Sequence, residues 1–254
     1  MSHWYERKTG EPAYTYINSK GEEKDTTLRQ ARQLDLWPSV TTVMGMAASP
    51  GLDMYRQQQL CQAAWDQRPL PDMTYNIWKC RVVDQSKEHA KNASNRGTEI
   101  HDALENFYTN GTFSGDLAHI TLPVVDFLEK EFPDAQWVAE ASFCSSLGFG
   151  GKVDLHDPVN KIVLDFKTKD TDDIKKMVAY DGHHLQTAAY AVGLFEDSNE
   201  FYNLGYIKRY NLFISTQIPG LLKLTESTDF DREWDMFKSL LDYWHLSNRY
   251  YPNA

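Results

Sequence analysis

Cysteine is scarce in this 254-residue sequence, and its scarcity excludes several kinds of site. Cys61, Cys80 and Cys144 stand far apart and form no C-x-x-C pair, so neither a disulfide framework nor a four-thiolate metal site is predicted. No apolar run approaches the length of a membrane span, and the first residues lack the apolar segment of a secretion signal. We therefore expect a cytoplasmic protein with no membrane partner.

The sequence also has no excess of positively charged residues. The chain has 26 lysines and arginines against 36 aspartates and glutamates, which gives a formal net charge of −10. A chain this acidic is not a general binder of polyanions, so any contact with nucleic acid would be local, in a groove. The apolar content of 41% is ordinary for a globular protein. We predict a single domain over residues 1–254.

One segment predicts a β-hairpin. Asp157-Pro158-Val159-Asn160 is a strong turn signal, because proline presets φ and Asp and Asn favour local backbone bonds. With these four residues as the loop, Asp154 lies opposite Val163. Side chains alternate between the faces of a strand, so Asp165 and Lys167 share the face of Asp154. The other face would be apolar and would pack on a core, with Val153, Leu155, Ile162, Leu164 and Phe166.

The polar face of this hairpin combines two carboxylates and an amine. Two carboxylates can hold a hard divalent cation such as Mg²⁺, and a neighbouring amine can stabilise the charge that builds up on a phosphate attacked by water. The pattern therefore indicates metal-dependent cleavage of a phosphodiester, with Asp154, Asp165 and Lys167 as candidate catalytic residues. An ordinary half-exposed hairpin with solvated Asp and Lys side chains is the alternative interpretation.

Two predicted helices carry further candidates. His101 could supply an imidazole nitrogen to a metal, and Glu105 lies one turn further along the same amphipathic helix. Gln186 and Tyr190 are also four residues apart, where an amide and a phenol could bind a phosphate or position the lysine. Each has a structural alternative, in which His101 and Glu105 are ordinary helix residues and Gln186 and Tyr190 lie at the edge of a packed helix.

Two more segments allow two interpretations each. Ser39, Thr41 and Thr42 could bind a phosphate through their hydroxyls and a helix N-terminus, but a plain N-cap explains them equally well. Glu140 could support the site from the neighbouring strand or could simply point outward.

The order of the predicted elements favours an α/β (α+β) fold with a central mixed β-sheet flanked by helices. A short hairpin is expected within residues 1–37, and residues 84–96 predict a polar helix or loop. The other predicted helices cover 52–68, 98–108, 122–132, 174–195 and 230–246, and further strands cover 137–144 and 206–215.

Four motif strings occur in order along the chain: Arg96-Gly97-Thr98-Glu99-Ile100-His101, Gly151-Lys152-Val153-Asp154, Asp165-Phe166-Lys167 and Gln186-Thr187-Ala188-Ala189-Tyr190. Together they resemble G-x-x-x-H, G-x-x-D, (D/E)-x-K and Q-x-x-x-Y of the RecB-like branch of the PD-(D/E)XK nuclease superfamily. Residues 38–43 also resemble a segment common in phage and mitochondrial exonucleases of this branch. The resemblance covers about residues 37–195, so we expect an N-terminal extension (1–36), a nuclease core (37–195) and a C-terminal strand and helix (196–254).

The resemblance implies a restriction-endonuclease-like core and a role for each motif residue. The implied ligands of Mg²⁺ or Mn²⁺ are His101, Asp154, Asp165 and the carbonyl of Phe166. Lys167 would orient or activate water and stabilise the transition state, while Gln186 and Tyr190 would shape the site and touch the substrate. Some relatives hold an iron–sulfur cluster through one early and three late cysteines. This chain has no cysteine after Cys144, so we predict no cluster.

The implied activity is hydrolysis of DNA to a 5′-phosphate and a 3′-hydroxyl by an exonuclease. Its DNA would be a single strand or a duplex end, in a bacterial cell or phage-infected host, with a recombination or replication protein as partner. Bases could stack on aromatic side chains, for which the candidates are Tyr14, Tyr16, Trp37, Tyr55 and Trp65. Three alternatives stay open: a structure-specific endonuclease, a regulatory binding module, and a subunit active only within a recombination or CRISPR-adaptation complex.

Overall fold

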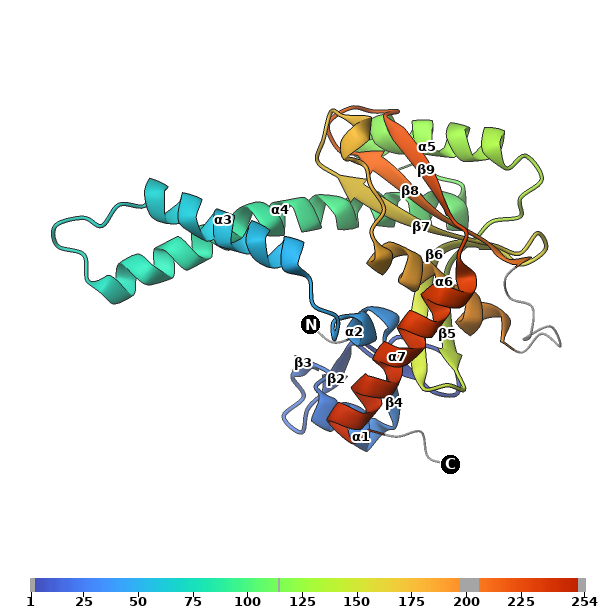
Figure 1. Ribbon diagram of the computed structural model, residues 1–254, viewed down its shortest axis with the longest axis horizontal. Coiled ribbons are helices and arrows are strands. Elements are labelled where there is room, and N and C mark those ends of the chain that lie inside the picture. Colours follow the sequence, from blue (N-terminus) through green and yellow to red (C-terminus); the bar gives the residue numbers. More distant parts are fainter. Residues whose placement is uncertain (1–2, 114, 197–205, 251–254) are drawn as a thin grey trace. The chain divides into compact units, whose positions relative to one another are not determined.

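A five-stranded mixed β-sheet organises most of the chain in the computed structural model, which describes residues 3–113, 115–196 and 206–250 (Figure 1). The spatial order of the strands is β5-β6-β7-β8-β9. Strands β7 and β8 run parallel, and the other neighbours are antiparallel. The predicted central mixed sheet is therefore confirmed. Its strands are β5 (Val138–Ser145), β6 (Phe149–Asp157), β7 (Ile162–Lys169), β8 (Lys208–Ser215) and β9 (Leu222–Ser227).

The parallel strands β7 and β8 are joined by a helical crossover, as parallel pairing requires. The crossover contains η2 (Ile174–Lys176) and α6 (Asp181–Phe195). The single helix predicted over 174–195 is thus divided. The division follows from the ends of the two helices, since η2 stops at Met177 and Tyr180 is the extended N-cap of α6.

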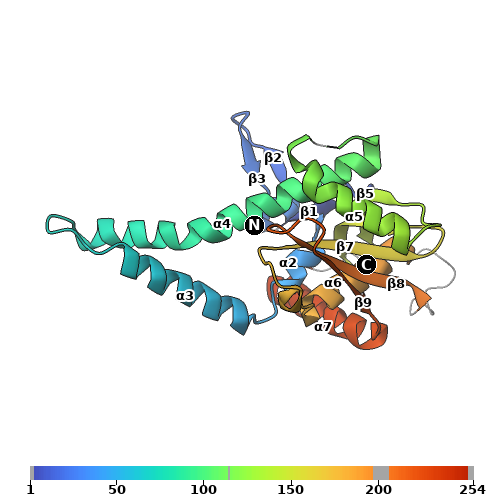
Figure 2. The same ribbon diagram turned by 90° about the horizontal axis from the view of Figure 1, so that it is seen from above.

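Helices flank the sheet on both faces, as predicted (Figure 2). Helices α6 and α7 (Phe230–Asn248) share a hydrophobic core with one face of the sheet. Helix α5 (Ala118–Glu131), which follows η1 (Gly115–Leu117), covers the other face, where the ring of Phe132 packs on Tyr210 of β8. The largest buried side chains of the α6/α7 core include Trp4, Trp37, Phe149, Phe237 and Trp244.

The first 47 residues belong to this same core. Strands β1 (Trp4–Glu6) and β4 (Leu36–Pro38) form an antiparallel pair, and β2 (Thr15–Ile17) and β3 (Glu23–Asp25) form the predicted short hairpin. The short helices α1 (Leu28–Leu34) and α2 (Val40–Met44) complete the segment. The predicted boundary between residues 36 and 37 falls inside β4. Residues 3–36 contribute Trp4, Ala31 and Leu36 to the hydrophobic core.

Residues 48–100 form a separate compact unit, and residues 1–47 with 101–254 form the other. The single domain that we predicted did not anticipate this division. The smaller unit consists of α3 (Pro50–Asp66) and the first part of α4 (Tyr75–Asn110). Helix α4 is much longer than the predicted helix over 98–108, because residues 84–96 are helical and contain no proline or glycine that would end it.

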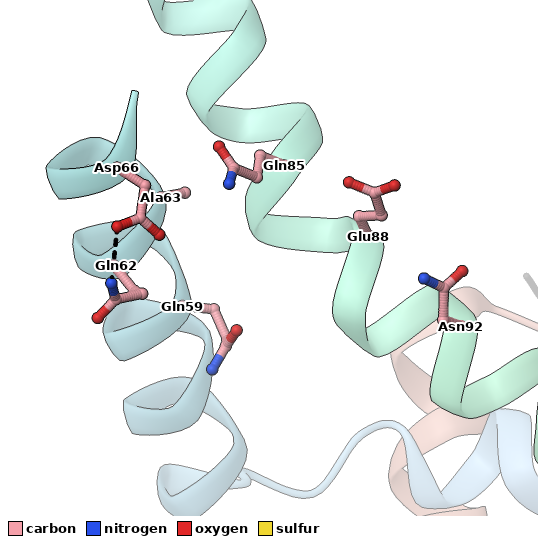
Figure 3. Close-up of a pocket in the computed structure, with 7 residues that line it drawn as sticks. All are labelled: Gln59, Gln62, Ala63, Asp66, Gln85, Glu88 and Asn92. Carbon is pink, nitrogen blue, oxygen red and sulfur yellow. Dashed lines mark hydrogen bonds between the residues drawn. The ribbon is translucent and has the colours of Figure 1, made fainter. Parts of the chain in front are cut away.

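A pocket of about 320 Å³ lies between the two helices of this smaller unit (Figure 3). Its lining is almost wholly amides and carboxylates: Gln59, Gln62, Ala63, Asp66, Gln85, Glu88 and Asn92. Within the described parts of the chain, no helix is both long enough and apolar enough to cross a membrane.

Candidate active site

The turn that joins β6 to β7 sets the register of the two strands. His156 pairs with Val163, where we predicted Asp154, so the predicted register was wrong by two residues. Asp157 extends β6 because its side chain accepts hydrogen bonds from the main-chain N–H groups of the turn, including that of Asn160 at 3.0 Å. An error of two residues, unlike an error of one, leaves each β7 side chain on its predicted face.

The regular alternation of side chains breaks in the middle of β6. Gly151 faces Tyr190 of α6, because a Cβ added there would lie 3.0 Å from the ring. His156 also faces α6, since its ring packs against Phe195. Residues five apart in a regular strand point to opposite faces. The break falls beside Glu140 of β5, whose φ is 55°, and the predicted separation into one polar and one apolar face is therefore wrong for this part of β6.

Asp154 lies at this break, beyond the last paired residues of β6 and β7. Its Oδ2 accepts a hydrogen bond from the main-chain N–H of Phe166 at 2.7 Å, and its Oδ1 lies 3.2 Å from Nδ1 of His101. The imidazole comes from α4, at the start of the part of that helix that belongs to the larger unit. Phe166 adds an edge-to-face ring contact with His101. The structure thus brings the side chains of His101 and Asp154 together beside Phe166.

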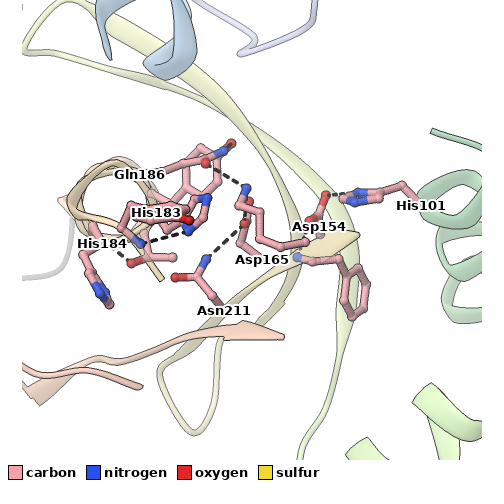
Figure 4. A network of polar contacts seen from close by, with 12 residues as sticks. His101, Asp154, Asp165, His183, His184, Gln186 and Asn211 are labelled. Carbon is pink, nitrogen blue, oxygen red and sulfur yellow. Dashed lines mark hydrogen bonds and ion pairs between the residues drawn. The ribbon is translucent and has the colours of Figure 1, made fainter. Parts of the chain in front are cut away.

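Asp165 and Lys167 form an ion pair on the α6 face of β7. Nζ of Lys167 lies 2.5 Å from Oδ2 of Asp165, whose side chain is almost fully buried. The same ammonium donates to Oε1 of Gln186 at 3.0 Å, and Nε2 of Gln186 donates to the hydroxyl of Tyr190 at 2.7 Å. Figure 4 shows this network between β7 and α6. Gln186 therefore contacts the lysine, and Tyr190 contacts Gln186.

The two carboxylates carry unequal pKa shifts. Burial raises the pKa of Asp165, and the nearby charge of Asp154 adds to this effect against the opposing Lys167 ammonium. Burial acts on Asp154 in the same direction, but His101 and Lys167 outweigh it and lower its pKa. Burial alone would lower the pKa of His101, yet the contact with Asp154 raises it. Burial therefore favours the neutral form of Asp165, whereas the neighbouring positive groups favour the charged form of Asp154.

The donors of this cluster suit a hard divalent cation. Two carboxylates and an imidazole nitrogen are ligands that Mg²⁺ and Mn²⁺ accept, and Oδ1 of Asp165 receives no hydrogen bond from any described residue. No group of three or more His, Cys, Asp or Glu side chains is arranged around an ion-sized space in the described ranges. Lys167 and His101 instead contact the carboxylates directly. The chemistry of the donor set fits a divalent ion, for which Oδ1 of Asp165 is the oxygen left without a described donor.

The hydroxyls of residues 39–42 form a helix cap. Oγ of Ser39 accepts from the main-chain N–H of Thr42 at 2.9 Å and contacts the hydroxyls of both Thr41 and Thr42. Ser39 is buried, and α2 has only five residues. The structure brings none of the three hydroxyls into hydrogen-bond contact with the carboxylate cluster among the residues that it describes. The N-cap interpretation accounts for them.

The two predicted supporting acids lie outside the network. Glu140 forms an ion pair with Lys152 of β6. Glu105 is half-buried on α4, and no hydrogen bond or ion pair connects it to the cluster in the described chain. Glu140 lies next to Asp154 across the strand pair, between the paired positions Ala139–Leu155 and Ala141–Val153. Its side chain contacts Lys152 instead of the cluster.

The predicted stacking aromatics have different environments. Trp37 is buried in the core and Tyr14 contacts Tyr5 through their hydroxyls at 2.7 Å, so both have structural partners. Tyr16 is half-buried on the β2–β3 hairpin. In the smaller unit, Tyr55 is 36% exposed and Trp65 is 70% exposed, which leaves Trp65 as the most accessible of the five.

Two polar residues beside the cluster were not predicted. Asn211 of β8 donates through Nδ2 to Oδ2 of Asp165 at 3.1 Å. His183 of α6 accepts a hydrogen bond from the main-chain N–H of Tyr180, and burial together with the Lys167 charge lowers its pKa to about 4 (Figure 4). The sequence held one signal for Asn211, a lone amide inside the strand Tyr210–Ile214. No comparable signal marked His183.

Comparisons with known proteins leave the family of this chain undetermined. No family model matches it, and no curated protein matches it. Among solved structures it is similar to one described as "Crystal structure of SSO0001", with 14% identity over 78% of this chain and 87% of that chain. The TM-score of this match is 0.34.

Proposed function

We propose that this protein is a Mg²⁺- or Mn²⁺-dependent deoxyribonuclease that hydrolyses DNA phosphodiesters as an exonuclease. The observation that carries the proposal is the cluster formed by Asp154, Asp165 and Lys167, together with His101 and Gln186, from four separate elements. The motif resemblance supports the same chemistry and is the basis for proposing action at a DNA end, with a recombination or replication protein as partner in the cytoplasm.

The metal ligands in this proposal are His101, Asp154, Asp165 and the carbonyl of Phe166. A bound divalent cation supplies a lowered pKa for an attacking water and charge neutralisation at the phosphate. Asp154, which lies where β6 and β7 separate, and Asp165 of β7 would hold the ion. His101 completes the set from α4.

Lys167 acts on the substrate in this scheme. A lysine ammonium has three N–H donors, and Asp165 and Gln186 accept two of them. The third is free to donate to a phosphate oxygen, where it stabilises the charge of the transition state. Burial and the two carboxylates raise the pKa of Tyr190 well above its ordinary value, so the phenol stays neutral and keeps a proton to donate.

The test is an assay of end-labelled DNA, linear and closed circular, single- and double-stranded, with Mg²⁺ or Mn²⁺ and with a chelator. We expect linear DNA to be degraded, circular single strands to stay intact, and chelator to stop the reaction. Asp165→Asn should abolish cleavage, whereas Asp172→Asn, at an exposed acid five residues beyond Lys167, should not.

Each other result has a distinct meaning. Cleavage of the circular single strand would replace the exonuclease by a structure-specific endonuclease. Activity that appears only on adding a partner protein would make the chain a subunit of a larger nuclease. Full activity of Asp165→Asn, or in the presence of chelator, would refute a metal-dependent mechanism at this cluster.

A further inference from the structure

Asn211 is an unusual residue for its position. It lies in the middle of β8, between Tyr210 and the apolar run Leu212–Ile214, and its side chain is fully buried. Burying an amide costs free energy unless its polar atoms are hydrogen-bonded. Oδ1 of Asn211 has no hydrogen-bond partner in the described chain. An apolar side chain of the same shape would leave no unpaired polar atom in this buried position. The stability of the strand therefore does not explain why the residue is an asparagine.

The register of the parallel pair β7–β8 supplies that explanation. Asn211 is the direct neighbour of Asp165, and both side chains lie on the face covered by α6. The residues two further along each strand show this, because Lys167 reaches Gln186 of α6 and Phe213 packs against His183 of α6. Nδ2 of Asn211 donates to Oδ2 of Asp165 at 3.1 Å (Figure 4).

The two donors that reach Asp165 differ in kind. Lys167 and Asn211 both bind Oδ2, from along the same strand and from the neighbouring strand. Two donors in different directions fix the rotation of the carboxylate, and they leave Oδ1 without a described donor. The neutral amide of Asn211 fixes the orientation of the Asp165 carboxylate without neutralising it. The negative charge of the carboxylate therefore stays available to a cation.

We infer that Asn211 is a positioning residue, which holds the Asp165 carboxylate so that its free oxygen is presented to the divalent cation. The inference rests on the proposed metal-dependent function. It extends the site beyond the four motif strings, because β8 lies outside the segment that carries the resemblance. Hydrogen-bond partners of metal ligands change metal affinity or activity by about 10- to 100-fold when removed.

The test compares Asn211→Leu with Thr225→Val in otherwise unchanged protein. Leucine keeps the shape of the amide and cannot donate. Thr225 of β9 pairs with Asn211 on the side away from Asp165, so its substitution alters the neighbouring strand without touching the carboxylate. The measurements are Mn²⁺ affinity by titration calorimetry without DNA, cleavage rate against Mg²⁺ concentration, and thermal unfolding.

For Asn211→Leu we expect a melting temperature close to that of the wild type, because loss of the hydrogen bond to Asp165 is offset by removal of the unpaired Oδ1. We also expect Mn²⁺ binding weakened by about 10- to 100-fold and a rate that excess Mg²⁺ partly restores. Thr225→Val should bind Mn²⁺ as the wild type does. Restoration by metal is a response that a purely structural role would not produce. Should Asn211→Leu fail to fold, Asn211→Ala provides the same loss of donor without any risk of overpacking.

Wild-type Mn²⁺ affinity in the folded Asn211 variants would overturn the inference, and so would equal weakening in Thr225→Val. A different result is expected if the proposed metal-dependent function itself is wrong. In that case the wild-type protein itself would neither bind Mn²⁺ nor cleave DNA.

Discussion

Replacing Lys167 by methionine removes the ammonium and keeps most of the length of the side chain. Asp165 and Gln186 hold that ammonium at 2.5 Å and 3.0 Å, so its third N–H is already oriented before substrate arrives. Loss of one preorganised donor to a transition-state charge costs about 100- to 1,000-fold in turnover, or about 2.7–4 kcal/mol. We expect a decrease of that size in kcat on linear single-stranded DNA.

The same substitution also changes stability and metal binding. Asp165 stays buried with Asn211 as its described donor, which costs about 1–3 kcal/mol. For a chain of this size each kcal/mol lowers the melting temperature by roughly 2–4 °C. A divalent cation replaces the lost positive charge, so Mn²⁺ should restore most of the stability and its affinity should not fall.

The assay measures turnover, melting temperature with and without Mn²⁺, and Mn²⁺ affinity by calorimetry. Lys208→Met is the control, because Lys208 is an exposed lysine at the opposite end of the neighbouring strand β8. Unchanged turnover of Lys167→Met would refute the role of the ammonium. Loss of Mn²⁺ binding together with turnover would refute the separation of roles between the lysine and the carboxylates.

Three further predictions test the fold around the site. The pKa of His183 is about 4 in the folded protein and 6.5 in the unfolded chain, so the stability that neutral His183 contributes is complete above pH 6.5 and is lost as pH falls towards 4. His183→Gln should therefore make the melting temperature depend less on pH over that range. Glu233→Ala leaves the buried guanidinium of Arg209 unpaired and should cost about 3–5 kcal/mol in urea unfolding. Gly193→Ala should destabilise α6 by about 1–3 kcal/mol, because its Cβ would lie 1.9 Å from the ring of Phe143.

Two matched variants serve as controls for the last two predictions. Asp181 and Arg232 form an exposed ion pair at 3.5 Å, so Asp181→Asn should change stability by less than about 1 kcal/mol. Gly182→Ala in the same helix α6 meets only Met44, at an ordinary 3.5 Å, and should be neutral or stabilising. Equal losses in Glu233→Ala and Asp181→Asn, or in the two glycine variants, would contradict the importance of burial.

Local spacing was enough to predict several parts of the site. Asp165 and Lys167 share one face of β7 because they are two residues apart in a strand, and Gln186 and Tyr190 share one face of α6 because they are four apart in a helix. Strand β8 and helix α7 were also predicted closely from their apolar patterns. Such patterns report short-range geometry, which the backbone of each element imposes by itself.

The turn between β6 and β7 could be predicted only in part from the residues that form it. The Asp-Pro turn was located correctly, but the side chain of Asp157 also accepts from the main-chain N–H of Gln136, which precedes β5. That bond contributes to holding Asp157 within β6, where it pairs with Ile162. Its donor is distant in sequence and could not be inferred from the turn. The positive φ of Glu140, which disrupts the alternation beside Asp154, depends equally on the paired strand.

The sequence by itself determined which chemical groups are present and which of them are neighbours along one strand or helix. Tertiary structure alone decided that His101 meets Asp154 across 53 residues and that Asn211 meets Asp165 across 46. It also placed Trp4 in the core of α7 and separated residues 48–100 as a second unit. Burial of large apolar surfaces selects these long-range contacts, and that selection depends on the whole chain at once.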